Sequence, residues 1–319
     1  MDWKGKHVLV TGGAGFIGSH TADTLMARGA RVTVFDNFST GFREFVPPQD
    51  GLRVVEADLL DQARLDDAMR GVDFVFHLAA NADIKDNLLD PRKCVDQNVV
   101  VTQNVLEAMR AAGVREIAFA STGSVYGEPK VIPTPEDAPF PVQTSLYATS
   151  KVAAEGLLTS YALGFQFRAW IFRFVSLLGP RYTHGHVIDF WRKLKSDPSR
   201  LHVLGNGKQQ KSYLNIADCV AAMLVAVERA REPINILNLG HDYWIAVDAS
   251  IALIARTMGV TPRLEYGGGE RGWVGDSPKI LLDTTRLRSL GWAPTKTIED
   301  SIVETLRFLM ESPYVERRR

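Results

Sequence analysis

The sequence predicts an α/β protein built on a doubly wound parallel sheet, with a smaller mixed α/β lobe toward the C-terminus. Three observations favour this fold class. Short apolar segments alternate with segments of helical spacing through the first half of the 319 residues, which is typical of parallel strands joined by crossover helices. The first apolar segment runs directly into a glycine-rich turn. After about residue 176 the alternation breaks down into loops and isolated helices.

The composition indicates a large folded core and no strongly charged partner. Hydrophobic residues make up 45% of the chain, and the formal net charge is zero. A neutral chain gives no electrostatic argument for nucleic acid or a membrane surface as the main partner. The opening segment MDWKGKHVLV lacks the apolar stretch of a signal peptide, and no run of about 18 apolar residues could span a membrane. We therefore expect a cytoplasmic protein.

The two cysteines, Cys94 and Cys219, indicate neither a disulfide framework nor a metal site. Their spacing matches no known arrangement of metal ligands. Both fall in segments of helical spacing, so we expect them to be reduced and buried, and we expect no bound metal.

The elements of the first half follow from their patterns, in chain order. Strands are expected at 7–12, 31–36, 52–58, 73–80 and 116–121, where apolar residues are continuous. Helices are expected at 19–28, closed by Gly29, at 59–71 and at 98–113. Because strand and helix alternate, the helices should cover both faces of the sheet.

The middle of the chain changes character. Residues 126–147 contain five prolines and should form a long irregular loop, which in a compact domain usually serves a function. A helix is expected over 147–165 and a buried strand over 167–174. Further on, a helix over 214–230 and a strand over 234–240 resume the pattern.

This order of elements predicts two lobes between which the chain crosses more than once. A nucleotide-binding domain should comprise residues 1–175 plus about 212–242. A substrate lobe should comprise about 176–211 plus 243–319, where helices mix with glycine-rich turns.

The glycine-rich turn VTGGAGFIGSH is the first motif that indicates a ligand. Gly12, Gly15 and Gly18 follow a strand and precede a helix. The first glycine allows a tight turn, the second lets the backbone approach a pyrophosphate, and the third lets the helix pack closely on the strand. The pyrophosphate then lies at the helix N-terminus, where free N–H groups and the helix dipole favour an anion. This arrangement is typical of a Rossmann dinucleotide-binding domain.

Asp36 indicates which dinucleotide the turn binds. It ends the second expected strand, about 20 residues after the glycines. A carboxylate at this place accepts hydrogen bonds from the ribose hydroxyls of adenosine and repels a 2′-phosphate. No arginine follows directly in FDNFSTG, so the sequence favours NAD over NADP.

The segment YATSK indicates the chemistry. Tyr147 and Lys151 are four residues apart, so on a helix they share a face. A nearby ammonium favours the tyrosinate and is expected to lower the pKa of the tyrosine. A tyrosine tuned in this way can take the proton of a sugar hydroxyl while hydride leaves the same carbon.

Taken together, these motifs resemble the extended short-chain dehydrogenase/reductase family, and especially its NAD-dependent nucleotide-sugar epimerases and dehydratases of the UDP-glucose 4-epimerase type. The resemblance covers most of the chain. The matching segments stand in family order: TGGAGFIGSH, FDNFSTG, Asp58, HLAA, Asn98 in NVVVTQNVLEA, STGSVYGE, YATSK and a late LGW.

The resemblance implies a role for individual residues. Tyr147 would be the general base and then the acid, Thr122 would hydrogen-bond the reacting hydroxyl, and Lys151 would also bind the nicotinamide ribose. Asp58 and Leu59 would flank the adenine. The remaining cofactor contacts implied are Gly12, Gly15, Phe16, Ile17, Gly18, Asp36, Asn37, Ser39, Thr40, Gly41, Leu78, Ala79, Ala80, Asn98 and Phe174.

The residues after Thr122 argue against dehydration. Dehydratases of the family carry Asp and Glu at the next two positions, whereas this chain has Gly123 and Ser124. Neither residue can move a proton to or from a sugar carbon or a leaving hydroxyl at neutral pH. Decarboxylases of the family usually keep the Glu as well. A 4-epimerase, which oxidises C4 and returns hydride to the other face, needs no further acid or base.

The substrate half departs from the family pattern. In GNGKQQKSY, Lys211 stands where relatives have Arg, and Lys lacks the bidentate geometry of Arg. Trp273 replaces a second family Arg, with Arg271 two residues earlier, and Ser176 replaces an Asn that contacts sugar or phosphate. His184 and His186 lie in a loop expected to cross the substrate. The expected substrate contacts are Lys85, Thr122, Ser124, Ser176, His186, Val187, Val203, Lys211 and Arg271.

Several alternatives stay open at this point. A UDP-hexose is favoured as substrate, but GDP-, CDP- and dTDP-sugars are not excluded. A nucleotide-sugar dehydrogenase or decarboxylase would look similar in sequence, and so would a non-catalytic NAD-binding sensor, although such a sensor should have lost Tyr147 or Lys151. Relatives often dimerise through two helices, which here would be Val99–Ala112 and Ser150–Tyr161, so we expect a homodimer.

Overall fold

A seven-stranded parallel sheet organises the computed structural model, which describes residues 1–140, 142–272 and 279–312, with the backbone alone at 84–86. The strand order is β11-β6-β5-β4-β1-β2-β3, and every neighbouring pair is parallel. The strands are β1 (His7–Thr11), β2 (Arg31–Asp36), β3 (Leu52–Glu56), β4 (Phe74–His77), β5 (Glu116–Thr122), β6 (Arg168–Phe174) and β11 (Ile234–Leu239). The predicted doubly wound α/β fold is confirmed.

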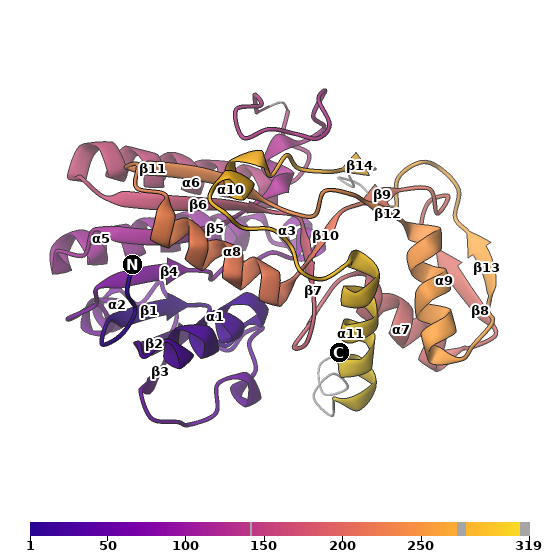
Figure 1. Cartoon of the computed structure of the whole chain (residues 1–319), viewed down its shortest axis with the longest axis horizontal. Coiled ribbons are helices and arrows are strands. Elements are labelled where there is room, and N and C mark those ends of the chain that lie inside the picture. The colour runs from indigo at the N-terminus through magenta and orange to yellow at the C-terminus, as the bar shows by residue number, and fades with distance from the viewer. Residues whose placement is uncertain (141, 273–278, 313–319) are drawn as a thin grey trace.

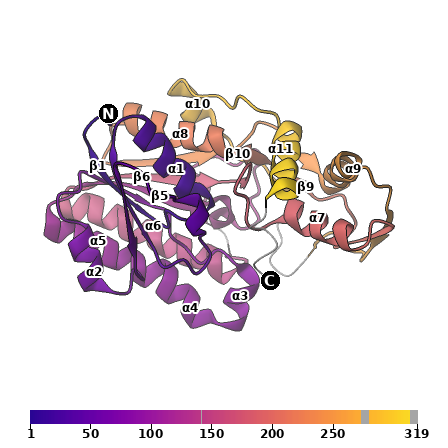
Figure 2. The same ribbon diagram turned by 90° about the horizontal axis from the view of Figure 1, so that it is seen from below.

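Helices cover both faces of this sheet (Figures 1 and 2). One face packs against α1 (Phe16–Ala27) and α8 (Ile216–Arg229), and the other packs against α2 (Gln62–Ala68), α5 (Val101–Ala112) and α6 (Leu146–Phe165). Successive strand residues point to opposite faces, so in β1 Val8 and Val10 enter one core while Leu9 enters the other. Two buried faces explain why the strands are continuous apolar runs in the sequence.

Several element boundaries differ from the sequence prediction. Strand β4 is shorter than the predicted 73–80, and α2 is shorter than the predicted 59–71. Helix α1 begins at Phe16 rather than at 19, because Phe16 and Ile17 already pack against the core that α1 shares with β1. Strand β3 ends at Glu56 rather than at 58. The helix expected over 98–113 begins earlier, because α5 is preceded directly by α4 (Pro91–Val95) and a π-helical turn, η2 (Asp96–Val100).

The expected long loop runs from β5 to α6 and contains a short 3-10 turn, η3 (Gly123–Tyr126). It is fastened to the C-terminal half of the chain, because Thr134 forms a β-bridge with Leu282. The main-chain N–H of Thr134 donates to the carbonyl oxygen of Leu281 at 2.9 Å. The loop is therefore irregular, as predicted, but held.

A smaller lobe lies beside the C-terminal edges of the sheet strands (Figure 1). Its core is separate from the two sheet cores and includes residues of α7 (His186–Ser196), α9 (Val247–Met258) and α11 (Ile298–Glu311). The sequence pattern missed its short strands, which are β7 (Ser176–Leu178), β8 (Arg200–Val203), β9 (Gln210–Lys211), β10 (Tyr213–Asn215), β12 (Ile245–Ala246), β13 (Arg263–Tyr266) and β14 (Lys279–Ile280). A separate core supports the two-lobe prediction, whose residue boundaries stay a prediction.

Cys94 and Cys219 are free and buried, as expected. Among the residues that the structure describes, no helix is long and apolar enough to cross a membrane.

Candidate active site

The glycine-rich turn lies at the C-terminal ends of β1 and β4. Gly12 has a φ of +66°, and a Cβ there would lie 2.7 Å from the Cα of Ala79. A Cβ on Gly18 would lie 2.1 Å from the carbonyl oxygen of Gly12. Any side chain at either position would force the turn away from the segment after β4 or from α1. Two of the three roles predicted for the glycines thus have a direct steric basis.

The N-terminus of α1 is open toward this turn. Gly15 is the N-cap residue, and no side chain caps the first turn of the helix. A Cβ on Gly15 would meet only the carbonyl oxygen of Gly12, at 3.2 Å. An uncapped helix start in a tight backbone cradle is suited to an anion such as a pyrophosphate.

Asp36 ends β2 beside the same turn. Its carboxylate accepts hydrogen bonds from the main-chain N–H groups of Ala14 at 2.9 Å and Phe38 at 2.8 Å. These bonds fix the carboxylate next to the glycine-rich turn, and a carboxylate oxygen can accept more than one hydrogen bond. Asp58 is fixed in turn by the side-chain amide of Asn37 at 2.8 Å.

The other residues expected to contact the cofactor differ in how far they are buried. Leu78, Ala79, Ala80, Phe16 and Ile17 are half-buried, Asn37, Ser39 and Thr40 are exposed, and Gly41, Leu59 and Phe174 are buried. Gly41 packs against Ala14, where a Cβ would come within 2.8 Å of the Ala14 Cβ.

Asn98 links the segment after β4 to helix α6 by hydrogen bonds. Its side-chain oxygen accepts from the N–H of Asn81 at 2.8 Å, and its amide nitrogen donates to the carbonyl oxygen of Asn81 at 3.0 Å and to Ser150 Oγ at 2.9 Å. The side chain is almost fully buried. Asn98 therefore holds the segment after β4 against α6, a role that the family resemblance did not indicate.

Thr122, Tyr147 and Lys151 meet where β5 ends and α6 begins. Tyr147 is half-buried and hydrogen-bonded to Thr122. Lys151 is fully buried, and its Nζ donates to the carbonyl oxygen of Ala120 at 2.7 Å. The side chain of Ser145 caps α6 at the N–H of Ala148, so the helix starts just before Tyr147. The three residues predicted to be catalytic are thus brought together.

The expected lowering of the Tyr147 pKa is wrong for this structure. Burial raises the pKa of Tyr147 to about 12, and the hydrogen bond with Thr122 opposes that rise. Burial lowers the pKa of Lys151 to about 7, against the opposing charge of Glu155. The ammonium of Lys151 points at the Ala120 carbonyl oxygen, so the desolvation of the phenol outweighs any attraction between the two side chains.

Gly123 and Ser124 lie directly beside this group, in η3. Ser124 Oγ accepts a hydrogen bond from Thr122 Oγ1 at 3.2 Å, and its N–H donates back to Thr122 Oγ1 at 3.1 Å. Neither residue brings a carboxylate to the site.

His186 lies at the start of α7 in the smaller lobe, and its side chain is uncharged. Its ring stacks on Tyr213 with centroids 4.6 Å apart, and its Nε2 bonds with Ser250 Oγ at 2.8 Å. Burial, and next the charge of Lys211, lower the pKa of His186 to about 3. The neutral ring can offer a hydrogen bond but not a positive charge.

The cations expected at the substrate are Lys211 and Arg271. Lys211 lies in β9, half-buried near His186. Arg271 is exposed and forms an ion pair with Glu128 at 2.5 Å, which joins the smaller lobe to the segment after η3.

The other expected substrate residues are scattered. Ser176 is exposed at the start of β7, whereas Val187 and Val203 are buried in the core of the smaller lobe. His184 is exposed, and its ring stacks on Tyr182. Lys85 lies in α3 (Ile84–Leu89), where the structure describes only its backbone. Trp273 lies outside the described residues.

Comparisons with known proteins identify the family. The family model described as "NAD dependent epimerase/dehydratase family" matches residues 8–240. That segment contains the glycine-rich turn, Asp36 and the Thr122, Tyr147 and Lys151 group. The chain belongs to this family. NAD is therefore its cofactor, and the chain is an NAD-dependent enzyme of the nucleotide-sugar epimerase/dehydratase group.

Two curated relatives show the range of named activities in this family. A UDP-glucose 4-epimerase of Streptomyces lividans is 33% identical over 92% of this chain and 92% of its own. A UDP-glucuronic acid decarboxylase 2 of Arabidopsis thaliana is 32% identical over 94% of this chain and 67% of its own.

Two solved structures share the fold over nearly the whole chain. A UDP-galactose 4-epimerase is 38% identical, with a TM-score of 0.87 and coverage of 96% of this chain and 99% of that one. A UDP-glucose 4-epimerase of Thermus thermophilus in complex with NAD is 32% identical, with a TM-score of 0.85 and the same coverage.

The residues of this family member fit NAD. The cradle at Gly12 and Gly18 leaves no room for a Cβ, and the start of α1 carries no competing cap. Asp36 places a carboxylate at the end of β2 for ribose hydroxyls. When bound, NAD supplies a hydride acceptor and donor, and the protein supplies the proton chemistry.

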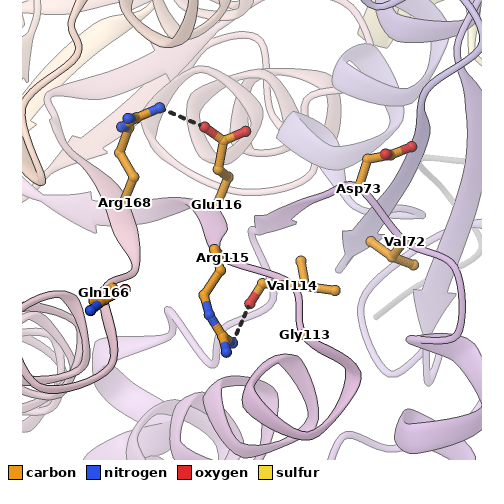
Figure 3. A pocket seen from close by; sticks show the side chains of 8 residues that line it. All are labelled: Val72, Asp73, Gly113, Val114, Arg115, Glu116, Gln166 and Arg168. Atoms are coloured by element: carbon orange, nitrogen blue, oxygen red, sulfur yellow. Dashed lines mark hydrogen bonds and ion pairs between the residues drawn. The ribbon is translucent and has the colours of Figure 1, made fainter.

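A polar hollow of ≈410 Å³ lies at the N-terminal ends of β4, β5 and β6 (Figure 3). Its lining includes Glu116 and Arg168, the first residues of β5 and β6, which form an ion pair at 2.8 Å. Because the family site lies at the C-terminal ends of the strands, this hollow is not part of it.

Two residues near the site were not found from the sequence. Glu155 lies one turn beyond Lys151 on α6, and Arg173 in β6 pairs with it at 2.7 Å. The four-residue spacing from Lys151 to Glu155 was visible, but nothing in the sequence identified Arg173 as the partner.

Proposed function

We propose that this chain is a nucleotide-sugar 4-epimerase that acts on a UDP-hexose. The observation that carries the proposal is the Thr122, Tyr147 and Lys151 group with Gly123 and Ser124 beside it. This set can move one proton on and off a sugar hydroxyl. It contains no second acid or base at the positions that dehydratases of the family use.

In the proposed cycle, Tyr147 takes the proton of the C4 hydroxyl while the hydride leaves C4. Thr122, hydrogen-bonded to Tyr147, orients the hydroxyl. The 4-keto sugar then turns in the site, and Tyr147 returns the proton as hydride arrives at the opposite face. Because burial raises the pKa of Tyr147 to about 12, the tyrosinate must be favoured by positive charge close to it, which is the role we assign to Lys151.

UDP is supported by the names of the relatives, and a diphosphate of any nucleotide by the cations of the smaller lobe. Lys211 and Arg271 are the positive side chains that we place at the diphosphate. His186 is uncharged because its pKa is lowered to about 3, so we assign it a hydrogen bond to the substrate. A lysine and an arginine can bind a diphosphate without further cations.

The second candidate is net oxidation, with or without decarboxylation. It is favoured by the Arabidopsis thaliana relative, which is named a UDP-glucuronic acid decarboxylase. Release of CO₂ from UDP-glucuronate, or lasting NADH with any sugar nucleotide, would favour this candidate.

The test is a panel of UDP-, GDP-, CDP- and dTDP-sugars incubated with the NAD-loaded protein. Products are followed by proton NMR and by absorbance at the NADH band. We expect interconversion of UDP-glucose and UDP-galactose without lasting NADH. If the product is a stable ketosugar, stoichiometric NADH or CO₂, the epimerase proposal is wrong and the second candidate takes its place.

We also propose a homodimer through Val99–Ala112 and Ser150–Tyr161. These helical segments lie side by side on one face of the sheet (Figure 2), and Ala153 on α6 is exposed. We expect light scattering to give twice the mass of the chain, and Ala153→Arg to halve that value. A wild-type protein with the mass of one chain would contradict the dimer.

A further inference from the structure

One face of α6 holds the end of β5 at three points. Tyr147, Lys151 and Glu155 are spaced four residues apart and therefore lie on one face of the helix. The last three residues of β5 each contact a different one of them. Tyr147 bonds with Thr122, Lys151 Nζ donates to the carbonyl oxygen of Ala120 at 2.7 Å, and Ser121 Oγ donates to the carboxylate of Glu155.

Glu155 is itself fixed by Arg173 of the next strand, β6. The guanidinium donates from Nη2 to one carboxylate oxygen at 2.7 Å and from Nε to the other at 3.1 Å. The two side chains are only 3% and 5% exposed. Arg173 Nη1 also donates to the Tyr126 hydroxyl at 2.8 Å and to the carbonyl oxygen of Glu136 at 2.9 Å. The carboxylate therefore has one possible orientation.

Burying such an ion pair is costly, so stability alone is a weak reason for its presence. Its position suggests another reason, because Glu155 is one helical turn from Lys151. Among the groups that raise the pKa of Lys151, Glu155 has the larger effect and Cys94 of α4 the smaller one. The other titratable groups near the lysine are His77 of β4, with a pKa of about 3, and Tyr147, with a pKa of about 12, and both are neutral at pH 7.

We propose that Glu155, held by Arg173, is a positioning residue for the reaction: it keeps the Lys151 ammonium and the end of β5 in the arrangement that Tyr147 needs. For turnover the inference rests on the proposed function. The part that concerns the protonation of Lys151 does not rest on the proposed function, because the titration of this lysine can be measured without a substrate. Glu155 opposes the effect of burial on the pKa of Lys151, which lies at about 7.

The test is Glu155→Gln, which keeps the shape of the side chain and the acceptor for Ser121 but removes the charge. In NAD-loaded protein with ¹⁵N-labelled lysine, the Lys151 signal is assigned by its loss in Lys151→Met. We expect Lys151 in Glu155→Gln to titrate at a lower pH than in the wild type. A shift of about one pH unit would cut its protonated fraction at pH 7 roughly fivefold, and kcat at pH 7 by a similar factor, with KM nearly unchanged.

The matched control is Glu116→Gln. Glu116 of β5 and Arg168 of β6 also form an ion pair, at 2.8 Å, but it is partly exposed and lies at the N-terminal ends of these strands, away from Lys151 (Figure 3). We expect this variant to leave both the Lys151 titration and the pH profile of kcat unchanged. If Glu155→Gln folds and its Lys151 titration coincides with that of the wild type, the proposal is wrong.

A second variant covers the case in which Glu155→Gln fails to fold because Arg173 is left buried and unpaired. The double change Glu155→Gln with Arg173→Met removes both charges. We expect it to fold and still to titrate Lys151 below the wild-type pH, whereas a wild-type titration would overturn the proposal. If the wild type converts no sugar nucleotide, the proposed function fails, and the substrate-free titration still decides this inference.

Discussion

Tyr147 is half-buried and Lys151 is fully buried, and burial shifts their pKa values in opposite directions. Each shift disfavours the charged form, so burial alone favours a neutral phenol and a lysine that is only partly charged. The proposed cycle requires the opposite state, a tyrosinate beside an ammonium. The hydrogen bonds at the end of β5 hold the two side chains so that little reorganisation is needed when charge develops.

Replacing Tyr147 by Phe should abolish turnover while NAD still binds. The loss expected from removing a general acid–base group is about 10²- to 10⁴-fold, measured as kcat for the sugar nucleotide and as NAD affinity by calorimetry. The control is Tyr161→Phe on the same helix, whose hydroxyl interacts with Gln103 and Glu107 and should be dispensable. Normal turnover in Tyr147→Phe would overturn the assignment of the base.

Replacing Lys151 by Met should stabilise the fold, and more so at pH 6 than at pH 10. The pKa of Lys151 falls from 10.5 unfolded to about 7 folded. Between these values the unfolded state binds the extra proton, so wild-type stability rises with pH, by up to about 1.4 kcal/mol per pH unit. Below pH 7 the buried charge carries its full cost. Urea unfolding of the wild type and of Lys151→Met at pH 6 and pH 10 measures the difference in their free energies of unfolding. The same difference at the two pH values would contradict the prediction.

At the scale of the element, α1 and the turn before it pack closely against β1 and the segment after β4. The start of the helix is placed by contacts between backbones, at Gly12 with Ala79 and at Gly18 with Gly12. The anion site at the helix N-terminus therefore depends on how closely these backbones approach, and not on any side chain.

The change Gly18→Ala should separate α1 from the turn. The new Cβ would meet the Gly12 carbonyl oxygen at 2.1 Å, so we expect a loss of about 1–3 kcal/mol in stability and a clear loss of NAD affinity. Gly164→Ala on α6 is the matched control, because a Cβ there meets nothing within 4 Å and alanine favours a helix by about 0.5–1 kcal/mol. Thermal unfolding and NAD titration of both variants test this prediction. Equal stability and NAD affinity in Gly18→Ala and Gly164→Ala would contradict it.

At the scale of the whole molecule, each lobe contains a histidine that is held neutral. His77 lies in the sheet, bonded to Thr11 Oγ1 at 2.7 Å and Thr102 Oγ1 at 3.0 Å, and His186 lies in the smaller lobe. Burial is the largest cause in both cases and lowers each pKa to about 3. The two lobes are thus sensitive to acid for the same reason.

The free energy of unfolding should fall as the pH drops below 6.5. The unfolded state takes up protons at 6.5 while the folded histidines stay neutral to about 3, and His77 alone should cost about 1.4 kcal/mol per pH unit in this window. Urea unfolding between pH 7 and pH 4 should show a shallower slope for His77→Gln than for the wild type. The same slope in both proteins would exclude His77 as a cause.

Several parts of the site could be predicted because they depend on local spacing. The glycine-rich turn, Asp36 at the end of β2, and the pair Tyr147 and Lys151 are all set by a few adjacent residues. The short strands of the smaller lobe could not be predicted, because segments such as Gln210–Lys211 become strands only through partners distant in the chain.

By itself, the sequence determined the alternation of strands and helices, the family and the cofactor, and it supplied the proposal for the residues that move the proton. Each of these follows from local order, since periodicity and motif spacing act within a few residues. Only the tertiary structure decided that the Tyr147 pKa is raised, that Lys151 contacts the Ala120 carbonyl oxygen, and that Arg173 fixes Glu155. Desolvation and ion pairing depend on which segments pack together, and no spacing along the chain records that.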